Sequence, residues 1–199
     1  MRRSALVAIL VLLGTAAYAG TPGLVWGVSW GTSVSFASWD RASFLTADRY
    51  LAETDEINTA GHFNGFIDAY MGIGTGRNEL TINAGWHGAG GSARLFPVML
   101  GWNWFRNADR TEGLFIRTAA GAGFPENGGK LCGLADLGLG IRQRLSTRLS
   151  IDYGIGLNTS LVHPDRLTDP YSGNIVNKED IRSSKSLLGA LKMSIRLIF

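Results

Sequence analysis

Large apolar residues occur at every second position along most of this chain. The clearest stretch is residues 148–161, "RLSIDYGIGLNTSL", where Leu149, Ile151, Tyr153, Ile155 and Leu157 alternate with small or polar residues. A period of two places successive side chains on opposite faces of an extended strand, whereas the faces of a helix repeat every three to four residues. The pattern therefore predicts β-strands with one apolar face and one polar face.

The same alternation predicts about eight strands, at residues 26–36, 62–74, 79–87, 96–104, 114–124, 131–142, 148–161 and 190–199. Short polar links at 75–78, 106–112 and 143–147 alternate with longer ones, of which the longest are about 39–59 and 162–184. The middle of the first long loop mixes charged and apolar residues, and we expect a short amphipathic helix there. Short turns at one end and long loops at the other are typical of an outer-membrane barrel.

The size of the apolar side chains indicates which face points outward. An eight-stranded barrel has an interior just wide enough for side chains to fill it. The apolar face is too bulky for that space, so we expect it to contact lipid; a soluble lipocalin-like barrel, with its apolar face inside, is the alternative. Aromatic residues near the strand ends are expected to form two interfacial girdles, including Trp26, Trp86, Trp102 and Trp104. The predicted fold is an all-β, eight-stranded antiparallel transmembrane up-and-down β-barrel.

Composition agrees with an exported membrane protein. The chain is 45% hydrophobic and 18% charged, compared with about 25% charged residues in soluble domains. Its formal net charge of +3 gives no indication of nucleic-acid binding. Arg2 and Arg3, an apolar run and the sequence Ala17-Tyr18-Ala19 predict a signal peptide at residues 1–19. Residues 20–199 would then form the barrel domain.

Three stretches, "LFPVMLGWNWF", "LFIRTAAGAGF" and the terminal "SIRLIF", resemble the small outer-membrane β-barrel domain proteins of Gram-negative bacteria, the OmpX/OmpW-like porin-family superfamily. The resemblance implies an outer-membrane location with both termini in the periplasm. It also implies contact with outer-membrane lipid and lipopolysaccharide, and a role for Phe199 as the signal read by the barrel-assembly machinery. It implies no particular activity.

Nine charged residues are expected on the polar face, inside the barrel. We interpret them as a lumen charge network, because unpaired charges in a narrow interior are costly; an ion path is the alternative. The network comprises Asp68, Glu79, Arg117, Asp136, Arg142, Arg148, Asp152, Lys192 and Arg196.

The sequence offers little for catalysis or metal binding. His62, His87 and His163 show no paired ligand spacing, and the single cysteine, Cys132, is interpreted as a small packing residue. Ser160 and His163 could form a nucleophilic pair, but they do not match the His-x-Ser-Asn pattern of lipid A deacylases. We expect no catalytic residue, cofactor or metal.

The leading hypothesis is a non-enzymatic outer-membrane barrel that supports envelope integrity or binds an unidentified extracellular ligand through its long loops. A narrow channel for small solutes and a lipid A-modifying enzyme are the alternatives. No nucleic-acid partner is expected.

Overall fold

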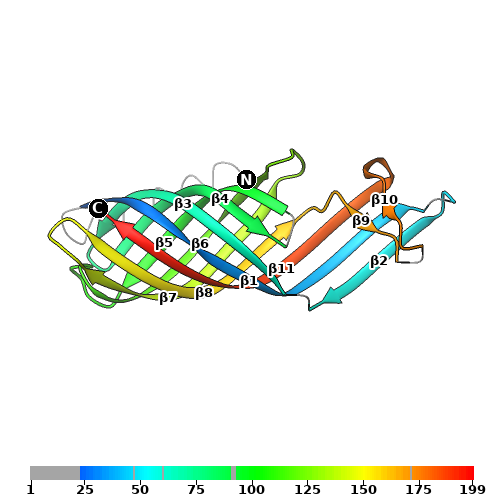
Figure 1. Ribbon diagram of the computed structural model, residues 1–199. Helices are drawn as coiled ribbons and strands as arrows, with labels where there is room; N and C mark the ends of the chain where they lie inside the picture. Colours follow the sequence, from blue (N-terminus) through cyan, green and yellow to red (C-terminus); the bar gives the residue numbers. More distant parts are fainter. Residues whose placement is uncertain (1–22, 47, 60, 91–92, 171) are drawn as a thin grey trace.

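The computed structural model describes residues 23–46, 48–59, 61–90, 93–170 and 172–199, so the predicted signal peptide at 1–19 lies outside the described residues. Eight antiparallel strands form a closed barrel, in which each strand pairs with its neighbours in sequence and β11 pairs with β1 (Figure 1). The strands are β1 (Gly23–Leu45), β3 (His62–Thr75), β4 (Asn78–Ala89), β5 (Ala93–Phe105), β6 (Gly113–Pro125), β7 (Cys132–Arg144), β8 (Ser150–Val162) and β11 (Ile181–Ile198). The predicted eight-stranded antiparallel up-and-down barrel is confirmed.

The two faces of the barrel wall are reversed relative to a soluble protein. Large apolar side chains are exposed on the outside, among them Trp26, Ile67, Met71, Leu139 and Ile155. Polar and charged side chains are buried on the inside. Since exposed apolar surface on this scale is favourable only in contact with lipid, the exterior is that of a membrane-spanning barrel.

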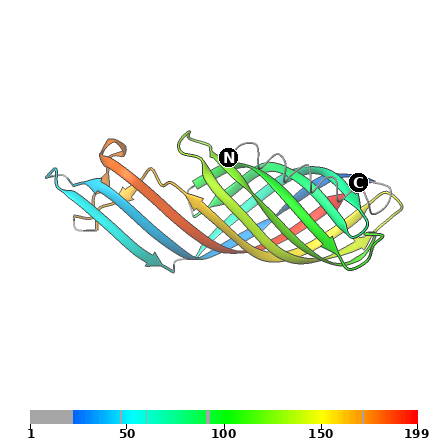
Figure 2. The same ribbon diagram turned by 180° about the vertical axis from the view of Figure 1, so that it is seen from behind.

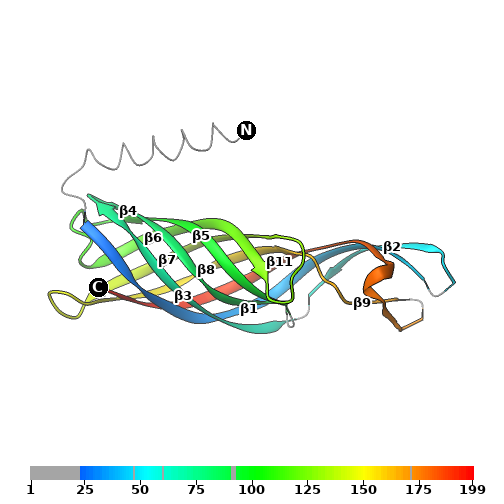
Figure 3. The same cartoon turned by 90° about the horizontal axis from the view of Figure 1, so that it is seen from above.

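Beyond one end of the barrel, β1 and β11 continue side by side and β2 (Leu51–Asn58) pairs with the far half of β1 (Figures 1 and 2). We call this three-stranded extension the outer sheet: residues 37–45, 51–58 and 181–187. The chain ends at the opposite end of the molecule (Figure 3). The described part of the chain contains no helix long and apolar enough to cross a membrane.

One face of the outer sheet has a small core of its own. The segment after β8 contains β9 (Leu167–Thr168), β10 (Ile175–Val176) and the short 3-10 helix η1 (Lys178–Asp180). Val176 of this segment is buried against Ala42 and Phe44 of β1, with Ala52, Leu167 and Ile181 packed around them. The outer sheet is therefore a folded unit and not a pair of loose loops.

The predicted loop at 39–59 and its amphipathic helix are wrong, because β1 runs on to Leu45 and β2 begins at Leu51. The register between β1 and β11 shifts between Ser35 and Ala37, which marks a β-bulge at Phe36. The extra residue changes the outward-facing positions from even numbers to odd ones. The alternation therefore breaks at Phe36, although the strand continues to Leu45. The loop predicted at 162–184 is likewise shorter, since β11 begins at Ile181.

Candidate functional site

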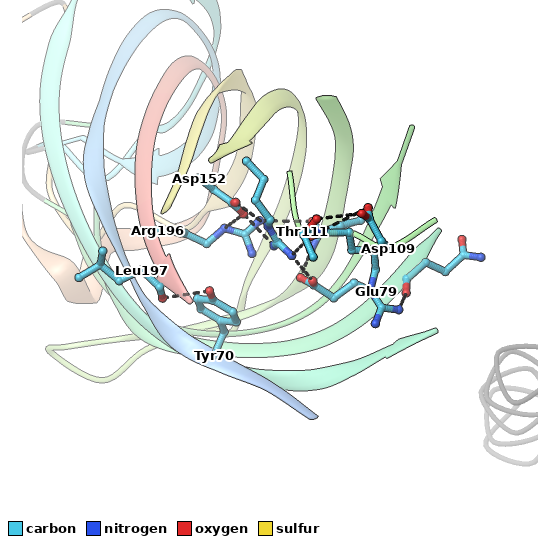
Figure 4. Close-up of polar contacts among 11 residues, drawn as sticks. Tyr70, Glu79, Asp109, Thr111, Asp152, Arg196 and Leu197 are labelled. Carbon is cyan, nitrogen blue, oxygen red and sulfur yellow. Dashed lines mark hydrogen bonds and ion pairs between the residues drawn. The ribbon is translucent and has the colours of Figure 1, made fainter. Parts of the chain in front are cut away.

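The end of the lumen nearest the C-terminus holds a fully buried network of charged side chains (Figure 4). Arg142 on β7 makes a bidentate contact with Asp152 on β8, with nitrogen–oxygen distances of 2.7 and 3.0 Å. The same guanidinium lies 3.1 Å from Glu79 on β4, and the amide of Asn103 donates to Glu79 at 2.7 Å. Arg196 on β11 lies 3.8 Å from Asp152. Five strands, β4, β5, β7, β8 and β11, are thus joined across the interior.

The turn between β5 and β6 folds over this network. In this turn, the carbonyl of Arg110 accepts a hydrogen bond from Arg142 at 3.2 Å. The guanidinium of the same residue donates a hydrogen bond to the carbonyl of Asn78 at 3.1 Å. On the opposite wall, the Tyr70 hydroxyl donates to the Leu197 carbonyl at 3.1 Å (Figure 4). Side chains and turn together fill this opening.

A second set of polar contacts lies farther along the lumen. Lys192 forms an ion pair with Asp136 at 2.7 Å, and Asn158 donates to the same carboxylate at 2.6 Å. His87 contacts Asp68 at 2.9 Å, with both side chains buried. Arg117 donates to Asn83 at 3.4 Å, and its Nε has no partner among the described residues.

An apolar cluster closes the lumen on the side of the outer sheet. It contains Ala89, Leu95, Met99, Ala119, Cys132, Leu134, Val162 and Leu188. Below it, a cavity beside His87 and Lys192 has a volume of about 10 Å³, which is room for one water molecule at most. A second cavity, of about 30 Å³, lies beside Arg117 and Arg196. Both cavities are small compared with a continuous water-filled channel.

The position predicted for Arg148 is wrong. It lies exposed in the turn 145–149, because β7 ends at Arg144 and β8 begins only at Ser150. Without it, the other eight predicted charges comprise four acids and four bases, so the interior is neutral when His87 is neutral. The structure places all eight of these side chains along the lumen.

Sequence reasoning did not identify the aromatic partners of the lumen cations. Lys192 lies 4.1 Å from the ring centre of Phe66, and Arg142 lies 4.4 Å from that of Phe105. Such contacts stabilise a cation in a desolvated site. For Phe66, a glycine on the facing strand was the available signal: a Cβ added at Gly31, its pairing partner on β1, would lie 2.8 Å from the Phe66 ring.

The predicted girdle tryptophans face outward. Trp26 and Trp102 are exposed, while Trp86 and Trp104 are partly buried. Trp26 stacks on Phe199 with ring centres 4.7 Å apart, and Trp102 donates its indole N–H to Asn78 at 3.0 Å. Both contacts lie at the C-terminal end of the barrel.

Ser160 and His163 do not contact each other as a nucleophile and its base. The Ser160 hydroxyl is buried and donates to Asn158 at 3.0 Å, whereas His163 Nδ1 donates to the Ser184 carbonyl at 2.7 Å. Cys132 is buried in the apolar cluster. Within the described residues, no three His, Cys, Asp or Glu side chains converge as metal ligands would.

Above the apolar cluster, the mouth of the barrel is a vestibule of about 550 Å³. Leu95, Val162 and Leu188 form its floor, and the outer sheet forms part of its wall. Asp40 on that wall accepts hydrogen bonds from Ser186, from Asn58 and from Ser38.

The far edge of the outer sheet is acidic. β2 pairs with β1 on one side and with no described strand on the other. Its Glu53, Asp55 and Glu56 are exposed, and none of them forms an ion pair with a described residue. Asp55 accepts a hydrogen bond from the Trp39 indole at 2.5 Å. The edge therefore offers unpaired backbone groups between carboxylates.

Comparison with family models and with curated proteins finds no match. Among solved structures, the chain is similar to the crystal structure of Neisserial surface protein A (NspA), with 10% sequence identity and a TM-score of 0.40. The similarity covers 85% of this chain and 97% of that one. Likeness at this level carries no information about ligands or activity.

Proposed function

We propose that this chain is a non-enzymatic barrel of the bacterial outer membrane that binds an extracellular protein through the edge of its outer sheet. The observation that carries the proposal is a folded three-stranded sheet, with an unpaired acidic edge among the described strands, projecting from a barrel whose lumen holds buried ion pairs. In this proposal the outer sheet lies outside the cell and both termini lie in the periplasm.

An unpaired strand is a template for another extended segment, because its free N–H and C=O groups need partners. Main-chain hydrogen bonds supply affinity in this mode, and side chains select the partner. Glu53 and Glu56 lie on opposite faces of β2, since they are an odd number of residues apart. An added segment would therefore meet negative charge on both faces, which favours lysine- or arginine-rich partners.

Like charge disfavours self-association. Two copies of β2 placed edge to edge would bring their carboxylates together, which is destabilising. A basic segment of another protein fits this edge better than a second copy of the chain.

The test uses the folded full chain in detergent micelles and a short labelled peptide that alternates lysine with valine. The expected result is saturable binding, lost when glutamate replaces lysine and lost when every peptide nitrogen is methylated, which removes the donors on both edges of the peptide. Methylation keeps the charge but prevents strand pairing, so an N-methylated peptide that binds equally well would refute strand addition.

A matched pair of variants locates the binding edge. Glu53→Gln with Glu56→Gln should weaken binding several-fold, whereas Glu112→Gln with Glu179→Gln removes the same charge elsewhere and should not. Equal loss in both would mean that the peptide responds only to net charge.

A further inference from the structure

A second surface feature lies on the outward face, where the outer sheet leaves the barrel. It is a groove of about 400 Å³. Trp39, Leu161 and Leu187 line its barrel side, and Arg41 and Lys185 line it farther out. The proposed binding edge on β2 does not use these side chains.

Polarity changes abruptly along this groove. Trp39 pairs with Leu187 across β1 and β11, and the two side chains are 47% and 40% exposed. Two residues farther along the same face, about 6–7 Å, Arg41 pairs with Lys185. Below Trp39, exposed apolar residues such as Phe36 continue down the barrel wall. The change from apolar to cationic therefore lies where lipid hydrocarbon would give way to headgroups.

The two cations lie directly opposite each other in the β1–β11 pairing. Like charges in that position destabilise a sheet. Neither forms an ion pair with a described residue: Asp55, opposite Arg41 on β2, instead accepts from the Trp39 indole. Among the described residues that line the groove, Glu53 is the one acid, so this part of the lining has an excess of one positive charge. An anion held between Arg41 and Lys185 would remove their repulsion.

We propose that this groove binds the phosphorylated headgroup of an outer-leaflet lipid, the lipid A part of lipopolysaccharide. The phosphate lies between Arg41 and Lys185, which are the side chains best suited to it, and an acyl chain lies against Trp39, Leu161 and Leu187. Free phosphate would satisfy the cations but would leave the apolar part of the groove unused. The inference depends on the proposed insertion in the outer membrane, in the proposed orientation.

The test is native mass spectrometry of the folded full chain, released from detergent in the presence of diphosphorylated lipid A or its dephosphorylated form. Wild type is expected to retain the phosphorylated lipid preferentially. Arg41→Gln with Lys185→Gln should weaken that binding by roughly tenfold or more, and Arg41→Lys, which keeps the charge, should retain most of it. The control, Lys130→Gln with Arg148→Gln, removes the same charge outside the groove.

Each outcome bears on the assignment. Equal binding by wild type and the groove variant would overturn it, as would equal retention of phosphorylated and dephosphorylated lipid. Displacement of lipid by millimolar inorganic phosphate alone would assign the cations to a free anion. A heat shift on gels confirms that each variant is folded. A folded wild type that does not partition into bilayers would refute the proposed membrane function itself, whereas insertion without phosphate preference refutes only the lipid site.

Discussion

At the scale of single residues, Arg142 links more of the lumen than any side chain described here. It contacts Asp152 through two hydrogen bonds, Glu79 through one and the ring of Phe105 through a cation–π contact. All four side chains are buried. The energetic importance of Arg142 lies in what its loss would leave behind, namely two buried carboxylates with reduced compensation.

We therefore expect Arg142→Met to lower the free energy of unfolding by about 3–5 kcal/mol. The measurement is urea unfolding of the folded protein in detergent micelles, followed by the heat shift on gels. Adding Glu79→Gln and Asp152→Asn to the same chain should restore much of the loss, because no unpaired carboxylate then remains. A single variant within about 1 kcal/mol of wild type would contradict the network.

At the scale of elements, the outer sheet is held at its base by Asp40. Burial alone would raise the pKa of this carboxyl. The hydrogen bonds that it accepts from Ser186, Asn58 and Ser38 outweigh burial and lower its pKa below the ordinary value of 3.8. A depressed pKa in the folded state stabilises that state at pH values above 3.8, and the contribution is lost as pH falls through the lowered pKa.

Hydrogen exchange should therefore show the outer sheet opening more readily at pH 3 than at pH 6, after correction for intrinsic exchange rates, while the barrel strands stay protected. In the Asp40→Asn variant, the amides of the outer sheet should exchange faster than in wild type at pH 6. Lowering the pH to 3 should reduce their protection only slightly further. The same pH dependence in wild type and variant would assign it to another carboxylate.

The bulge at Phe36 makes a second, geometric prediction for the same sheet. Deleting Ala37 removes the extra residue and keeps Trp39 outward and Asp40 inward, so the outer sheet should persist. Deleting both Ala37 and Ser38 reverses those faces and should expose Phe44. Limited trypsin digestion at Arg41 and Arg49 measures the difference; equal resistance of the two deletions would contradict the assigned register.

These elements also show what sequence could and could not predict. Alternation located the barrel strands, because lipid requires one continuous apolar face, but it did not identify β2, which lies outside the barrel wall. It could not follow β1 past the bulge, where the phase changes by one residue. It could not pair His87 with Asp68 either, because the register that brings β4 beside β3 is a tertiary property. Arg148 was misplaced because alternation does not define where a turn begins.

At the scale of the whole molecule, the barrel and the outer sheet differ in what they can do. The lumen combines two charged networks with an apolar cluster, and the cavity described between them has room for one water molecule at most. The vestibule above the apolar cluster is open and large by comparison. The proposed recognition at the outer sheet would therefore be separate from any passage through the barrel.

We expect the purified full chain to give no channel steps in planar bilayers at moderate voltage and salt. Arg142→Gly with Arg196→Gly, which shortens two of the filling side chains, should remain silent if the apolar cluster alone closes the lumen. Wild-type conductance that changes with Asp152→Asn or Arg196→Gln would instead support the channel hypothesis.

The way the buried charges are distributed over the strands has a consequence for biogenesis. Arg142 and Asp152 belong to one hairpin, β7–β8, and Asp68 and His87 belong to another, β3–β4. Each of these two pairs can thus form within its own hairpin before the cylinder exists, whereas Glu79 and Asp136 meet their cations only when another hairpin or strand arrives. The last strand differs: Lys192 and Arg196 of β11 meet their carboxylates on β7 and β8. Delivery of β11 is accordingly the step that brings Lys192 and Arg196 to the carboxylates of β7 and β8, and pairing of β11 with β1 then closes the cylinder.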